Sequence, residues 1–165
     1  AMISRNLQAV RQRLQQACVQ AGRAPDAVRL LVVSKTFDAT AVLQAVEAGQ
    51  TAFGENYVQE GIEKILALSQ DADIVDPIEW HFIGPLQSNK TKPVAEHFAW
   101  VQSIDRLKIA QRLNDRGQHI PKTYPATRDL GLIGRRGNAI GFLAEVLLSN
   151  EMPGDHEYEH EQAPQ

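Results

Sequence analysis

The sequence has one cysteine, little net charge and no apolar run long enough to cross a membrane. With Cys18 alone, the chain cannot form an internal disulfide, which is typical of proteins in a reducing compartment. The net charge of −3 gives no sign of a nucleic-acid surface or of binding to an anionic membrane. Polar residues interrupt the apolar core that a signal peptide would need, at Arg5, Asn6, Arg11 and Arg13. We therefore expect a cytoplasmic protein without a nucleic-acid or membrane partner.

Strands and helices alternate through residues 1–116, a length that can bury the core of one domain. Helical spacing of apolar residues predicts helices at Ser4–Ala21, Ala39–Ala48, Tyr57–Leu68, Thr91–His97 and Arg106–Asn114. Short apolar runs predict strands at Leu30–Ser34, Thr51–Phe53, Trp80–Ile83 and Trp100–Ile104. This alternation is typical of parallel βαβ units in an α/β fold. Four units make half of a β/α TIM-type barrel, because a closed barrel needs eight strands and typically about 250 residues.

The alternation breaks down after residue 116. Residues 118–138 hold prolines and glycines without a strand period, 139–148 could form one apolar helix, and 151–165 are expected to be a disordered acidic tail. Basic and acidic side chains number 13 each in residues 1–116, but 4 and 7 in residues 117–165. We therefore divide the chain into 1–116, 117–150 and 151–165. A truncated or frameshifted reading frame, which we favour, or a genuine C-terminal variant would explain the change.

Lys35 directly follows the apolar run that begins at Leu30. In β/α folds the carboxyl ends of the strands form the open edge where ligands bind. Partial burial at this edge disfavours the charged ammonium form of a lysine and favours an amine that can attack an aldehyde. Taken alone, such a position more often belongs to a lysine whose stem lies on apolar surface while its charge reaches water.

Two further segments favour the functional interpretation. Residues 53–60 are Phe-Gly-Glu-Asn-Tyr-Val-Gln-Glu, and residues 79–90 are Glu-Trp-His-Phe-Ile-Gly-Pro-Leu-Gln-Ser-Asn-Lys. Together with Val33-Ser34-Lys35, they resemble the pyridoxal phosphate homeostasis proteins, the YggS/PROSC family, and the resemblance runs from about Ile3 to about Arg116. It implies a barrel like the N-terminal domain of alanine racemase, with pyridoxal 5'-phosphate (PLP) as its cofactor.

The resemblance implies a cofactor-binding set made of Lys35, Asn56, His81, Ile83 and Gly84. Lys35 would hold PLP as a Schiff base. The amide of Asn56 could hydrogen-bond the cofactor, although an asparagine at this position suits the N-cap of the following helix equally well.

His81 lies between Trp80 and Phe82, so strand alternation places it on the face opposite both aromatic rings. Such a histidine can be a hydrogen-bonded core residue as well as a neighbour of the cofactor. Ile83 and Gly84 end the same strand, where the glycine can let the backbone pass close to a ligand or turn sharply.

In the family, the phosphate site and the arginine that faces the pyridine nitrogen come from the last strands of the barrel. Those strands are missing from the predicted pattern, so we assign no residue to either role. Arg135 and Arg136 lie among glycines whose spacing matches neither a dinucleotide fingerprint nor a P-loop. Residues 156–160 fit the zinc motif H-E-x-x-H, but they follow Pro153 and have no apolar face. We assign no metal ligand and no catalytic residue.

The sequence thus favours a PLP-binding protein of vitamin B6 homeostasis, or the N-terminal half of one, that lacks robust turnover. Its partners would be PLP and PLP-dependent apoenzymes, and we expect a monomer. Two alternatives stay open. An amino-acid racemase-like PLP enzyme would need an acid–base residue on the ring face opposite Lys35, and a non-functional fragment would leave strand edges uncovered.

Overall fold

The computed structural model describes residues 2–115 and 122–125. Five strands form one parallel sheet: β1 (Val32–Val33), β2 (Ala52–Glu55), β3 (Glu79–Phe82), β4 (Trp100–Ile104) and β5 (Lys122–Pro125). The helices are α1 (Met2–Gln20), α2 (Ala39–Glu47), α3 (Val58–Ser69), α4 (Thr91–His97) and α5 (Leu107–Asp115), with a 3₁₀ turn, η1, at Ser88–Lys90. The expected helix at 139–148, the acidic tail, Arg135, Arg136 and the H-E-x-x-H motif lie outside the described residues.

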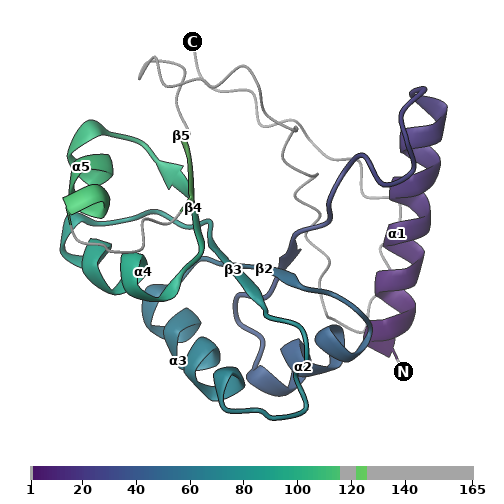
Figure 1. Cartoon of the computed structure of the whole chain (residues 1–165), viewed down its shortest axis with the longest axis horizontal. Helices are drawn as coiled ribbons and strands as arrows, with labels where there is room; N and C mark the ends of the chain where they lie inside the picture. Colours follow the sequence, from purple (N-terminus) through teal and green to yellow (C-terminus); the bar gives the residue numbers. More distant parts are fainter. Residues whose placement is uncertain (1, 116–121, 126–165) are drawn as a thin grey trace.

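The strands lie in the sheet in their order along the chain, β1-β2-β3-β4-β5, and each pairs in parallel with the next. A helix follows each of β1 to β4 (Figure 1). Sequential parallel strands joined by helices are the arrangement of a β/α barrel, and the described strands form an open arc of one. The α/β fold expected from the sequence is therefore confirmed.

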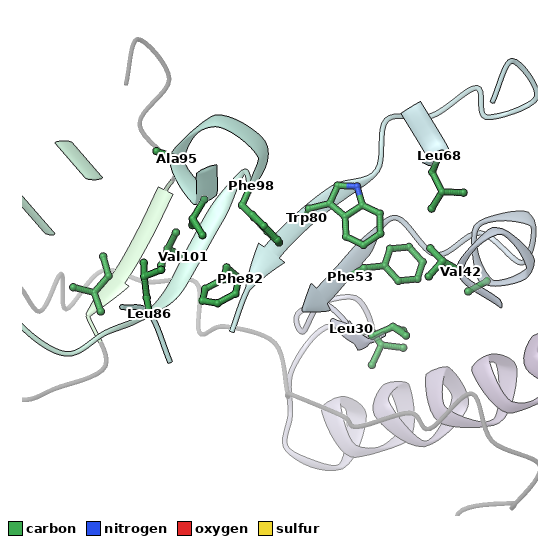
Figure 2. Packing of buried hydrophobic residues seen from close by; sticks show 14 of the residues in the cluster. Leu30, Val42, Phe53, Leu68, Trp80, Phe82, Leu86, Ala95, Phe98 and Val101 are labelled. Carbon is green, nitrogen blue, oxygen red and sulfur yellow. The ribbon is translucent and has the colours of Figure 1, made fainter. Parts of the chain in front are cut away.

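The hydrophobic core lies between the sheet and its helices. Figure 1 shows α2 to α5 along the outside of the curved sheet, with α1 packed against α2. Phe53 and Trp80 point into this layer with their ring centroids 5.7 Å apart, and Phe82 meets Phe98 edge-on at 5.4 Å (Figure 2). Cys18 is buried, as expected for a small core residue. The helix-facing side of the strands therefore supplies most of the apolar burial.

The predicted elements agree with the structure closely, with one addition. The bounds of α4 and β4 are those predicted, and the other predicted elements differ at their ends. β5, however, lies in the stretch where we expected no strand, and it pairs with β4 through Trp100 with Lys122 and Val101 with Thr123. Its residues, Lys-Thr-Tyr-Pro, contain no apolar run and are bounded by proline, so the sequence gives no strand signal and the strand is defined by its backbone pairing with β4. Among the described residues, no helix is both long and apolar enough to span a membrane.

Truncating a ring in the core should lower the free energy of unfolding far more than truncating an exposed side chain of a helix. Phe82 is 0% exposed and Leu66 of α3 is 49% exposed. We expect Phe82→Ala to lower the free energy of unfolding by about 3–5 kcal/mol. Leu66→Ala should change it by less than about 0.5 kcal/mol. Urea titrations of both variants measure the difference, and similar losses would contradict the placement of the core.

Candidate cofactor-binding site

The carboxyl ends of β1, β2 and β3 bring three of the predicted site residues to one edge of the sheet. The register aligns one residue from each strand: Val33, Gly54 and His81. Two residues further along each chain stand Lys35, Asn56 and Ile83, where alternation directs side chains to the face away from the helices. Because neighbouring parallel strands lie about 4.8 Å apart, these three positions are close enough to contact one small ligand.

Lys35 occupies the turn that follows β1 and is half-buried. A hydrogen bond of 3.2 Å from the Phe37 N–H to the Ser34 carbonyl closes this turn. The next residue, Thr36, has a φ of 68°, in the left-handed region. Such a conformation is unusual for a β-branched residue and costs of the order of 1–3 kcal/mol. Lys35 therefore sits beside a strained residue whose conformation the surrounding contacts must hold.

A buried ion cluster lies beneath this turn, on the helix-facing side of the sheet. Lys64 of α3 is 5% exposed, and its ammonium lies 2.7 Å from Oε1 of Glu55, which is fully buried, and 2.7 Å from Oε1 of Glu60. Burial raises the pKa of Glu55, while the hydrogen bonds from Lys64 and Ser34 oppose the rise. Removing one partner of such a buried pair typically costs about 3–5 kcal/mol, because the other charge is left uncompensated.

This cluster was not predicted from the sequence. Glu60 and Lys64 are spaced i, i+4 on a helix, which is also the spacing of an ordinary exposed ion pair. The available signal was Glu55, an acidic residue inside a buried strand, which requires a partner of opposite charge.

Asn56 has a buried side-chain oxygen, Oδ1, with no hydrogen-bond partner among the described residues. The helix-capping alternative for Asn56 is wrong, because the N-cap of α3 is Tyr57 and no side chain caps that helix end. Helix α3 begins one residue later than the alternative required, and Asn56 Oδ1 accepts no hydrogen bond from the first-turn N–H groups. Leaving a buried amide oxygen without a partner costs free energy. Asn56 therefore carries, at the carboxyl edge, an acceptor that no described residue uses.

Gly84 is required by the close approach of the neighbouring strand's backbone. A Cβ at this position would lie 2.2 Å from the backbone oxygen of Asn56 and 2.7 Å from its Cα. The Gly84 carbonyl also accepts a hydrogen bond from the Ser103 hydroxyl. Gly84 therefore lets the segment after β3 pack directly against Asn56. The two alternatives raised from the sequence, a close approach to a ligand and a sharp turn, stay predictions.

His81 lies on the inner face of the sheet, opposite Trp80 and Phe82 as predicted, and it stacks on Trp100 at 5.5 Å. Its Nε2 is 2.7 Å from Oε1 of Glu79, and its Nδ1 is 2.8 Å from Nε2 of Gln102. A neutral ring that donates from Nε2 and accepts at Nδ1 satisfies both contacts. Glu79 lies toward the amino end of the sheet and Gln102 toward its carboxyl end, so neighbouring side chains hold both nitrogens of the ring.

The two ionisable groups of this inner-face network have shifted pKa values. Burial lowers the pKa of His81 by more than the hydrogen bond and charge of Glu79 raise it. Burial alone would raise the pKa of Glu79, but the His81 hydrogen bond and the charge of Arg29, whose Nη1 lies 2.7 Å away, outweigh it and lower the pKa. Both groups therefore bind protons less readily in the folded protein than in the unfolded chain.

Folding stability should fall as His81 is forced to take up a proton. Because folding lowers the pKa of His81, the neutral ring stabilises the folded protein above its unfolded-chain pKa of about 6.5. This stabilisation is lost as the pH falls toward the lower pKa of the folded protein. We expect the urea midpoint of the wild-type protein to drop between about pH 7 and pH 5, and His81→Gln to reduce this drop. His97→Gln, which keeps His81, is the matched control and should retain the wild-type drop. An unchanged drop in His81→Gln would contradict this assignment.

The structure thus brings Lys35, Asn56 and Ile83 to one edge, places Gly84 directly against Asn56, and holds His81 deeper on the same face. The cofactor contacts of all five residues remain predictions.

Comparison with known proteins gives strong but partial matches. The chain is 58% identical over 120 residues to the pyridoxal phosphate homeostasis protein of Pasteurella multocida, covering 73% of this chain and 50% of that protein. It is 54% identical over 113 residues to the protein of the same name from Escherichia coli K12, covering 68% and 47%. The alignment with the Vibrio cholerae protein of that name is 51% identical over 137 residues, covering 83% and 56%. This last alignment is longer than the stretch from Ile3 to Arg116 on which the resemblance was based.

Solved structures also match part of this chain. PipY of Synechococcus elongatus, a COG0325 family member solved with PLP bound, is 38% identical with a TM-score of 0.58, and the match covers 68% of this chain and 47% of PipY. An unknown protein from Bifidobacterium adolescentis is 30% identical with a TM-score of 0.61, covering 70% and 49%. No family model matches the chain. The chain spans about half the length of the curated relatives it matches, and this matched part belongs to the family of the pyridoxal phosphate homeostasis proteins.

Proposed function

We propose that this chain binds PLP covalently through Lys35 and serves in vitamin B6 homeostasis as a carrier without robust turnover. The observation that carries the proposal is the alignment of Lys35, Asn56 and Ile83 at the carboxyl edge of three neighbouring strands. The names of the curated relatives and the PLP-bound PipY structure support the choice of cofactor.

The side chains at this edge match part of the chemistry of PLP. PLP supplies an aldehyde that a lysine amine can attack, a pyridine ring and a phosphate group. The Lys35 amine forms the new bond to the aldehyde carbon, and the carbonyl oxygen leaves as water. The buried Oδ1 of Asn56 lacks a partner among the described residues, so it can accept a hydrogen bond from a protonated nitrogen or a hydroxyl of a ligand. Ile83 supplies an apolar contact beside it.

The arrangement of His81 supports a carrier rather than a racemase-like enzyme. General acid–base catalysis needs a titratable group within hydrogen-bond reach of the reacting atoms. Both ring nitrogens of His81 are already bonded, to Glu79 and to Gln102. A carrier of this kind would deliver PLP to PLP-dependent apoenzymes in the cytoplasm, where a chain with a single buried cysteine needs no oxidising environment.

Lys35 should be the lysine that captures PLP. After incubation with PLP, borohydride reduction and peptide mapping, we expect the pyridoxyl label on Lys35 and its loss in Lys35→Ala. The physical reason is that this half-buried lysine lies at the same sheet edge as Asn56, whose Oδ1 has no partner among the described residues, whereas an exposed lysine has neither feature.

Lys90 provides the control, because it is exposed and ends the 79–90 signature segment. Lys90→Ala should retain the wild-type amount of label. Label spread over several lysines, or label that persists in Lys35→Ala, would contradict the proposed site.

A further inference from the structure

The turn that carries Lys35 is attached to helix α3 on both sides of the lysine. On the preceding residue, the Ser34 carbonyl accepts a hydrogen bond from Lys64 Nζ at 2.7 Å, and the Ser34 hydroxyl donates to Glu55 Oε1 at 2.9 Å. On the following residue, the Thr36 N–H donates to Glu60 Oε1 at 2.6 Å. The backbone of Lys35 is therefore held between two fixed neighbours.

Lys64 joins these attachments into one unit. An ammonium group has three N–H donors, and those of Lys64 reach the Ser34 carbonyl, Glu55 Oε1 and Glu60 Oε1, each at 2.7 Å. Glu60 is shared, because the oxygen that accepts from Lys64 also accepts from Thr36. Movement of α3 relative to the turn would break several charge-assisted hydrogen bonds at once.

The conformation of Thr36 shows why the turn needs these contacts. Its φ of 68° lies where β-branched residues are rarely found, so an unattached chain would leave that conformation. Leaving it would rotate the Lys35–Thr36 peptide and change the direction of the Lys35 side chain. The hydrogen bond from Thr36 to Glu60 opposes this rotation.

We propose that Glu60 and Lys64 are positioning residues for Lys35: they hold the strained turn so that the amine points to the inner face of the sheet beside Asn56. The inference rests on the proposed function for its PLP readout, but it also makes a claim about the chain without cofactor. In the free protein, the position and accessibility of the Lys35 amine depend on Glu60.

Glu60→Ala is the principal variant, because it removes the shared acceptor, while the Glu60 side chain is 33% exposed and its loss is tolerated better than loss of the buried Lys64. Glu63→Ala is the matched control on the same helix, where Glu63 contacts Gln59 and is exposed. Glu60→Gln is the conservative variant, because an amide oxygen can still accept from both Lys64 and Thr36.

The first readout needs no PLP. Limited reductive methylation with formaldehyde, followed by mass spectrometry, compares the rate at Lys35 with the rate at exposed Lys90 in the same molecule. Because Lys35 is half-buried and Lys90 is exposed, formaldehyde should reach Lys35 more slowly in the wild-type protein, and the two rates should converge in Glu60→Ala as the turn is released. Amide hydrogen exchange at Thr36 should accelerate in the same variant. Glu63→Ala and Glu60→Gln should resemble the wild-type protein in both measurements.

The second readout is PLP affinity, followed by absorbance of the Lys35 adduct. We expect Glu60→Ala to raise Kd about tenfold, which corresponds to about 1.4 kcal/mol, and the other two variants to stay within about twofold of wild type. A wild-type protein that does not bind PLP would refute the proposed function, while the methylation ratio and amide exchange would still test the positioning role. Wild-type values for Glu60→Ala in these PLP-free measurements, an equal effect of Glu63→Ala, or a Glu60→Gln variant as impaired as Glu60→Ala would overturn the inference.

Discussion

The parallel register of β1, β2 and β3 is the constraint on which the candidate site depends. It aligns residues from three separate segments, and a slip of one residue would turn every side chain of a strand to the other face. Buried Gln50 helps to fix this register, because its Nε2 donates to the carbonyls of Leu30 and Ala52, both at 2.9 Å, at the start of β1 and β2. On β2, the missing side chain of Gly54 leaves room for Ile83, whose Cδ1 would lie 2.8 Å from a Cβ there.

Consecutive residues at the ends of these strands have different structural roles. Ser34 and Glu55 face the helices and join the ion cluster of Lys64, whereas the residues that follow them, Lys35 and Asn56, stand outside this cluster at the carboxyl edge. Strand alternation thus puts the polar network that holds the edge directly behind the residues proposed to contact the ligand. The cost of burying Lys64 and Glu55 is offset by hydrogen bonds that also fix the backbone of the site.

Most of the secondary structure could be predicted from sequence because the apolar residues of each element are periodic and most elements end at glycine, proline or polar residues. Lys35 was singled out because it follows an apolar strand and because its segment carries the family resemblance, and its role as the PLP lysine stays a prediction. The role of Lys64 could not, since an exposed helical ion pair and a buried one have the same spacing. The capping role of Asn56 was equally consistent with the sequence, and it failed because α3 starts at Val58, with Tyr57 as its N-cap. β5 was missed because its four residues are defined by pairing with β4.

The contacts that hold the Lys35 turn all lie within a short part of the chain. Ser34, Thr36, Glu55, Glu60 and Lys64 all lie within the first two β/α units, and no contact among them joins residues more than 30 positions apart. Covalent attachment to a lysine requires one amine in the right place, whereas phosphate recognition draws on backbone N–H groups at loops and helix ends. On the proposed function, the ion cluster would fix the place of the Lys35 amine, whereas the hold on a phosphate group would depend on other groups of the protein.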